Sequence, residues 1–137
     1  MTGRKPQEQF VTYTVLIVDD SKLARMSVVK LLSALHPDWP RLEAGNADEA
    51  LLQIEQQRPD IVLLDFNMPG KDGLAFAAEL KDRNSHLSLA LLSANRQVEV
   101  IQRAQAAGAT FLAKPLTEQA LAEFLEGAVR QRRGAVS

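Results

Sequence analysis

The chain has 137 residues, 46% hydrophobic and 24% charged, which suits one globular domain with a single core. Its 16 basic and 17 acidic residues nearly cancel, so the bulk charge favours neither a nucleic-acid-binding nor a membrane-binding surface. The absence of cysteine excludes disulfides, zinc–thiolate sites and cysteine nucleophiles, and no apolar run suits a signal peptide or a membrane span, so we expect a cytoplasmic protein.

Short apolar runs then alternate with segments of helical periodicity along the chain. The apolar runs are bounded by turn or cap residues, which predicts strands. The expected strands are 13–18, 41–44, 60–64, 87–92 and 110–113. Apolar residues at helical spacing, with capping residues before them, predict the helices between these strands. The expected helices are 22–35, 46–57, 72–82, 98–107 and 117–130.

The alternation predicts the fold class. A helix between consecutive strands implies a crossover connection, so the sheet is expected to be parallel, with helices on both faces. Residues 12–133 form the expected domain, preceded by a flexible arm at 1–11 and followed by a short tail at 134–137. Ligands in such open α/β sheets bind beyond the carboxyl ends of the strands.

Polar and charged side chains follow four of the predicted strands. The residues at these ends are Asp19 and Asp20, Asp65, Ser93, and Lys114. Because the carboxyl ends of parallel strands share one edge of the sheet, we expect these side chains to meet there.

This set of side chains has a chemical logic. Two like charges 4 Å apart cost about 4 kcal/mol at an effective dielectric constant near 20, so three carboxylates need a proton or a cation. Carboxylate and carbonyl oxygens suit Mg²⁺, which keeps several of its waters. Lys114 supplies a mobile positive charge, and Ser93 can donate a hydrogen bond to a phosphoryl oxygen. A carboxylate nucleophile with these neighbours is equipped to accept a phosphoryl group.

The segments that carry these residues resemble the CheY-like receiver domains of two-component response regulators. The resemblance covers residues 15 to about 128, and it implies a flavodoxin-like (βα)5 fold with strand order 2-1-3-4-5. It rests on four strings in the family's order: VLIVDDS (15–21), IVLLDFNMPGKDG (61–73), LLSA (91–94) and FLAKP (111–115).

The resemblance implies a phosphoacceptor and a metal site. Asp65 would accept the phosphoryl group. Asp20, Asp65 and the backbone carbonyl of Asn67 would bind Mg²⁺, and Asp19 would hold a water on the metal.

It also implies a switch. Lys114 would contact the phosphoryl group, and Ser93 and Phe111 would move together on phosphorylation. The bond between Lys114 and Pro115 is cis in the family. Asn67 and Asn95 occupy the two positions that tune hydrolysis of the acyl phosphate in the family, and neither amide can act as a general base.

The partners implied are a sensor histidine kinase or phosphotransfer protein upstream and a protein target downstream, with a homodimer as one outcome of phosphorylation. The family's partner surface corresponds to residues 98–129. No direct nucleic-acid or membrane binding is expected, and no external substrate is turned over.

Two other functions are open. A phosphatase or phosphotransferase with an Asp nucleophile would normally carry a second Asp where Asn67 stands. The second alternative is a docking domain that is never phosphorylated. Such a domain would not need all of the polar and charged side chains that follow the predicted strands. The chain is expected to act alone or to be a receiver cut from a longer regulator. Arg130, Arg132 and Arg133 are interpreted as a favourable contact with a helix C-terminus, with a partner contact as the alternative.

Overall fold

The computed structural model describes residues 11–136 and contains the expected alternation of strands and helices. The strands of the main sheet are β1 (Val15–Val18), β2 (Arg41–Ala44), β3 (Ile61–Asp65), β6 (Ser88–Ser93) and β7 (Thr110–Ala113). The helices are α2 (Lys22–Leu35), α3 (Ala47–Gln57), α4 (Gly73–Arg83), α5 (Val98–Ala106) and α6 (Glu118–Val136).

Short polar side chains begin three of these helices. The Ser21 hydroxyl accepts a hydrogen bond from the Ala24 N–H, and Asp72 accepts from the first backbone N–H groups of α4. Asn46 accepts from the Glu49 N–H, as a capping box requires, but the Glu49 carboxylate accepts from Gly45 and not from Asn46. These caps explain why the sequence predicted the helix starts well.

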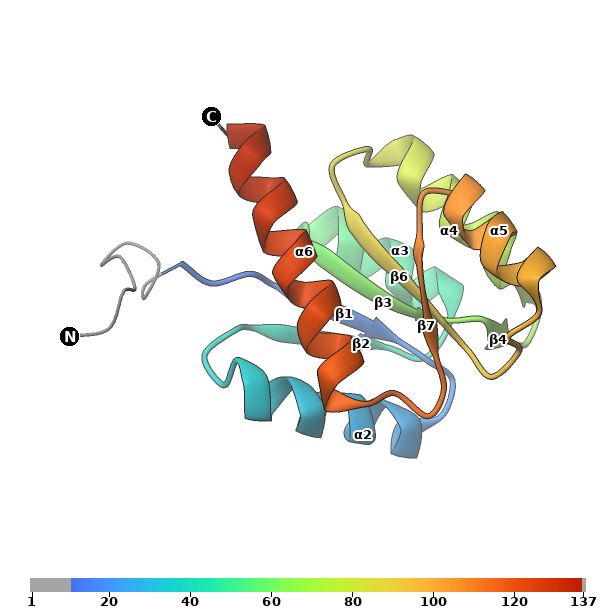
Figure 1. Cartoon of the computed structure of the whole chain (residues 1–137), viewed down its shortest axis with the longest axis horizontal. Coiled ribbons are helices and arrows are strands. Elements are labelled where there is room, and N and C mark those ends of the chain that lie inside the picture. Colours follow the sequence, from blue (N-terminus) through green and yellow to red (C-terminus); the bar gives the residue numbers. More distant parts are fainter. Residues whose placement is uncertain (1–10, 137) are drawn as a thin grey trace.

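The five main strands form one parallel sheet in the order β2-β1-β3-β6-β7. Numbered by the sheet alone, this is the order 2-1-3-4-5, so the expected flavodoxin-like fold is confirmed. Figure 1 shows α2 and α6 on one face of the sheet and α3, α4 and α5 on the other.

A separate core fills each face of the sheet. Strand residues with side chains on one face pack against α2 and α6, and those on the other face pack against α3, α4 and α5. The central strands β1, β3 and β6 are buried along their whole length, which explains their runs of Val, Ile and Leu.

Three features differ from the expectation. A small antiparallel hairpin, β4 (Asn67–Met68) with β5 (Lys71–Asp72), follows β3 and was not predicted. Strands β1, β3 and β6 begin one or two residues later than expected. Helix α6 continues to Val136 instead of ending near Arg130, so it takes in part of the expected tail.

The amino end of the sheet is closed by an ion pair between distant parts of the chain. The Arg132 guanidinium in α6 lies 2.7 Å from the Asp60 carboxylate, which also accepts the Thr14 N–H at 2.9 Å. Arg132 also donates to the backbone carbonyl of His86 at 3.3 Å. Arg132 therefore ties α6 to the start of β3, a more specific role than the helix-end contact we expected.

Trp39 packs near the edge strand β2. Its ring is buried and stacks on His36 at 3.7 Å, with Tyr13 edge-on at 5.1 Å. The expected flexible arm falls almost wholly on residues 1–10, outside the described residues. Within residues 11–136, none of the helices is both long and apolar enough to cross a bilayer.

Candidate functional site

The strand ends bring the predicted side chains to one edge of the sheet. Asp65 pairs with Leu92 across the β3–β6 ladder, and Ser93 pairs with Ala113 across the β6–β7 ladder. Asp19 follows β1 directly, and its N–H donates to the carbonyl of Ala44 at the end of β2. The parallel register therefore sets the relative positions of these residues before any side chain contact forms.

Lys114 makes the closest contact in the site. Its Nζ lies 2.6 Å from Oδ1 of Asp65 and 3.5 Å from Oδ2 of Asp19. Its backbone N–H donates to the carbonyl of Ser93, which holds the end of β7 against β6. The peptide bond to Pro115 is cis, as the resemblance implied.

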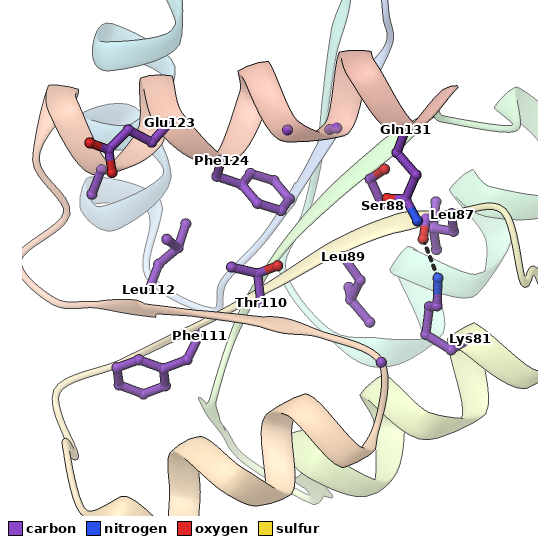
Figure 2. A pocket seen from close by; sticks show the side chains of 14 residues that line it. Lys81, Leu87, Ser88, Leu89, Thr110, Phe111, Leu112, Glu123, Phe124 and Gln131 are labelled. Atoms are coloured by element: carbon purple, nitrogen blue, oxygen red, sulfur yellow. Dashed lines mark hydrogen bonds between the residues drawn. The ribbon is translucent and has the colours of Figure 1, made fainter. Parts of the chain in front are cut away.

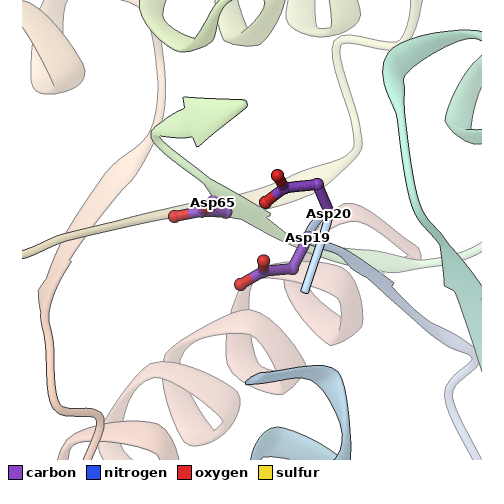
Figure 3. A group of neighbouring side chains, drawn as sticks. All are labelled: Asp19, Asp20 and Asp65. Atoms are coloured by element: carbon purple, nitrogen blue, oxygen red, sulfur yellow. The ribbon is translucent and has the colours of Figure 1, made fainter. Parts of the chain in front are cut away.

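Asp19, Asp20 and Asp65 form an acidic cluster beside this lysine. One carboxylate oxygen of each lies within 4.8 Å of those of the other two, and Figure 3 shows the three side chains gathered at the ends of their strands. Asp19 and Asp65 are only 6% and 5% exposed, whereas Asp20 is open to solvent. Oxygen ligands at this spacing, with one open side, fit a hard divalent cation that keeps part of its hydration shell.

The electrostatics of the site are dominated by burial. Burial raises the pKa of the Asp65 carboxyl, and the nearby Asp19 charge adds to this, while Lys114 and the Asn67 backbone N–H oppose it. Burial alone would lower the pKa of Lys114, but its hydrogen bond to Asp65 and the charges of Asp65 and Asp19 raise it overall. The lysine is therefore held as an ammonium group, while the carboxylate beside it carries a charge that burial disfavours.

Ser93 is buried with its hydroxyl engaged as an acceptor. The Asn95 N–H donates to Ser93 Oγ at 3.0 Å, and the Asn95 side chain in turn accepts from the Gln97 N–H at 3.0 Å. The bond from Asn95 uses the Ser93 oxygen as an acceptor, so the hydroxyl proton stays free to be donated to another group.

The loop after Asp65 is fixed by backbone packing. A Cβ atom on Gly73 would lie 2.6 Å from the carbonyl oxygen of Phe66, so only glycine fits without a shift of the backbone. Asp72 caps α4, and the β4–β5 hairpin carries Asn67 next to the acidic cluster. The contribution of the Asn67 carbonyl to metal binding stays a prediction.

Phe111 lies on β7, half-buried, on the face that packs against α4 and α5. Figure 2 shows its ring on the side of the strand away from Thr110 and Leu112, which face α6. These residues line a groove of about 510 Å³ at the open edge of the sheet, away from the acidic cluster. The switch role of Phe111 stays a prediction.

One contact to the acidic pair was not expected. Arg25 in α2 donates from Nη1 to the backbone carbonyl of Asp19 at 2.7 Å. A hydrogen bond to a backbone carbonyl leaves no pattern in the residue types, so this contact could not be predicted from the sequence.

The fold and the site together define a doubly wound α/β domain with an acidic pocket and a lysine at the carboxyl ends of its strands. The sequence model of the response regulator receiver domain matches residues 15–126. The chain belongs to this family, the CheY-like receiver domains of two-component signalling.

Relatives and solved structures agree with this family. The chain is 39% identical over 122 residues to the positive alginate biosynthesis regulatory protein of Pseudomonas aeruginosa, covering 87% of the chain and 48% of that protein. It is 30% identical to sporulation initiation phosphotransferase F of Bacillus subtilis, covering 74% of the chain and 81% of that protein. The structure of chemotaxis protein CheY4 of Vibrio cholerae matches with a TM-score of 0.76 at 27% identity, covering 86% of the chain and 99% of CheY4. The chain spans about half the length of several of the curated relatives it matches.

Proposed function

We propose that this receiver accepts a phosphoryl group on Asp65 from a histidine kinase or a phosphotransfer protein, and passes the signal on through a change of conformation. The observation that carries the proposal is the position of Asp65: buried at the end of a central strand, 2.6 Å from the Lys114 ammonium and within an acidic cluster. A carboxylate nucleophile held beside an ammonium group has both the attacking oxygen and the positive charge that phosphoryl transfer needs.

The carboxylates of Asp20 and Asp65, with the backbone carbonyl of Asn67, would hold Mg²⁺, and Asp19 would act through water. The fit rests on the spacing of the three carboxylates within 4.8 Å and on the exposure of Asp20 to solvent. When bound, the cation would neutralise part of the negative charge of the carboxylates and of the incoming phosphoryl group.

The side chains of this chain have separate tasks in the proposed transfer. A carboxylate oxygen of Asp65 attacks phosphorus while the bond from phosphorus to the donor breaks, and the donor leaves with that electron pair. Lys114 stabilises the negative charge of the transferred group, because its Nζ already lies against Asp65 and Asp19. Ser93 donates its hydroxyl proton to a phosphoryl oxygen.

Labelling with acetyl phosphate and Mg²⁺ tests the phosphoacceptor. The wild-type protein is expected to gain one phosphoryl group in an intact-mass measurement, and chelation of divalent cations should abolish this gain. Asp65→Asn should stay unlabelled, whereas Asp82→Asn, which removes an exposed carboxylate from α4, should label like wild type. Labelling of folded Asp65→Asn would refute the assignment.

The acyl phosphate is expected to be lost at a moderate rate, because the two family positions that tune hydrolysis carry Asn67 and Asn95. Both residues are exposed, and neither amide can take a proton from water. The decay of the labelled protein measures the rate directly. A half-life of seconds or less without a phosphatase would contradict this expectation.

The output of the domain is proposed to be a protein contact over residues 98–129, which include α5 and β7. We propose that phosphorylation promotes either dimerisation or release of a partner. We also propose that the domain catalyses only its own phosphorylation and dephosphorylation. The proposed location of the protein is the cytoplasm. Sizing the protein with and without beryllofluoride separates dimerisation from a monomeric switch. A screen against phosphate esters would detect the activity of a true phosphatase.

A further inference from the structure

Arg25 connects three elements next to the acidic cluster. It lies near the start of α2, but its side chain turns back toward the sheet and is only 17% exposed. Nη1 donates to the backbone carbonyl of Asp19 at 2.7 Å, and Nε donates to the Glu43 carboxylate on β2 at 2.9 Å. The planar guanidinium therefore bridges a loop carbonyl and a strand carboxylate in one fixed geometry.

The carbonyl that Arg25 holds belongs to the peptide bond between Asp19 and Asp20. A peptide group is planar, so a hydrogen bond to its oxygen restrains the plane and with it the backbone of Asp20. Asp19 has other restraints: its side chain accepts the Ser21 N–H at 2.9 Å and lies 3.5 Å from the Lys114 ammonium. Among the described residues, the Asp20 carboxylate has no hydrogen bond or ion pair of its own. The orientation of Asp20 therefore depends on its backbone, and Arg25 is one of the groups that restrain this backbone.

Glu43 in turn holds the guanidinium. Glu43 binds Nε from β2, which is paired with β1 along its length. A Cβ atom on Gly45 would lie 3.5 Å from Nη1 of Arg25, so this glycine lies beside the guanidinium without contacting it through a side chain.

We propose that Arg25 is a positioning residue for the cation site: through the Asp19 carbonyl it orients the Asp20 carboxylate toward Asp65 and so sets the affinity for Mg²⁺. This inference rests on the proposed function. It adds a residue that itself touches neither the cation nor the phosphoryl group.

The sign of the effect separates positioning from simple electrostatics. Arg25 is positively charged, so its loss would strengthen cation binding if charge alone mattered. Loss of positioning weakens cation binding instead, and residues that orient metal ligands typically contribute about 10–100-fold in metal affinity. We therefore expect Arg25→Met to bind Mg²⁺ about 10–100-fold more weakly than wild type.

Calorimetry of Mg²⁺ binding to the unphosphorylated protein is the direct test. Lys30→Met is the matched control, because it removes a positive charge from an exposed position of the same helix and should leave the affinity close to wild type. Arg25→Lys should be intermediate, since an ammonium group does not reproduce the fork that bridges two acceptors. Glu43→Gln should show a smaller loss than Arg25→Met, because the bond to the Asp19 carbonyl remains.

A second readout distinguishes positioning from general damage to the fold. In labelling by acetyl phosphate, the Mg²⁺ concentration for half-maximal rate should rise in Arg25→Met, while the rate at saturating Mg²⁺ returns close to that of wild type. A variant that is simply unfolded would lose rate at every Mg²⁺ concentration, and circular dichroism without Mg²⁺ measures its folded fraction.

Equal Mg²⁺ affinity in folded Arg25→Met and wild type would overturn the inference and leave the proposed function intact. An equal loss in Lys30→Met would also overturn it. A wild-type protein that binds no Mg²⁺ would overturn both. If Arg25→Met does not fold, the Mg²⁺ affinities of Arg25→Lys and Glu43→Gln test the inference in its place. Unchanged Mg²⁺ affinity in both variants would refute the role of Arg25.

Discussion

Charged side chains are balanced at one end of the sheet and unbalanced at the other. At the amino end, Asp60 and Arg132 pair one to one at 2.7 Å, and the second carboxylate oxygen accepts a backbone N–H. At the carboxyl end, three carboxylates cluster together, and the Lys114 ammonium group contacts two of them, Asp65 and Asp19. The first arrangement is complete as it stands, whereas the second carries an excess of negative charge in a partly buried place.

This difference indicates that the amino end has a structural role and the carboxyl end a chemical one. A satisfied ion pair at the amino end holds α6 against the sheet and gains nothing from a further ligand. The carboxyl end is destabilised by repulsion until a cation or a proton reduces its charge. The amino end, with Asp60 and Arg132, is called the stable base below, and the carboxyl end, with the acidic cluster, Ser93 and Lys114, is called the reactive rim. Substitutions at the stable base should change the free energy of unfolding, whereas substitutions at the reactive rim should change Mg²⁺ binding and phosphoryl transfer.

The largest effect is expected from Lys114→Met at the reactive rim. The substitution leaves Asp65 and Asp19 without their ammonium partner, and removes a donor that would stabilise the transferred group. Labelling by acetyl phosphate at saturating Mg²⁺ should slow by about 100-fold. Lys30→Met serves as the control and should label at the wild-type rate. A rate within a few-fold of wild type for Lys114→Met would show that Lys114 has no part in the transfer.

A moderate effect is expected from Arg132→Met at the stable base. The ion pair is about one-quarter exposed on each side, so its loss should lower the free energy of unfolding by about 1–2 kcal/mol. Urea denaturation measures this, with the exposed Arg130→Met as control. The Mg²⁺ affinity should not change. Weaker Mg²⁺ binding with an unaltered free energy of unfolding would contradict the proposal that the two ends of the sheet have separate roles.

The smallest effect is expected from Asp65→Asn on stability without Mg²⁺. Burial raises the pKa of Asp65 in the folded protein, so the ionised carboxylate costs stability there. This cost is absent below the ordinary value of 3.8, where the folded and unfolded states are both protonated, and it develops as the pH rises through the folded pKa. Asp65→Asn should therefore be more stable than wild type at neutral pH, and this advantage should disappear in acid. Thermal unfolding across pH measures both; a less stable Asp65→Asn at neutral pH would contradict the expectation.

The reactive rim could be predicted from the sequence, because each of its side chains lies at the end of a strand or directly after it. Asp19, Asp65, Ser93 and Lys114 needed only the rule that parallel strands end at one edge. The helix starts were equally accessible, since Ser21 and Asp72 cap through local hydrogen bonds.

The stable base and the Arg25 bridge could not be predicted in this way. Arg132 and Asp60 are 72 positions apart and meet only when α6 packs on the sheet. Arg25 binds a backbone carbonyl, which any residue provides at that position. The two-residue strands of the β4–β5 hairpin are too short to leave a pattern of alternating side chains.

Helix α6 has a mechanical consequence for these two ends. It begins four residues after Lys114, at Glu118, and reaches Arg132 after about 21 Å of helix. With Arg132 as a pivot, a tilt of about 5° would displace the Glu118 end by about 2 Å, given that length. Because Leu121 and Leu125 are buried in the core, such a tilt would also require the packing between α6 and the sheet to shift.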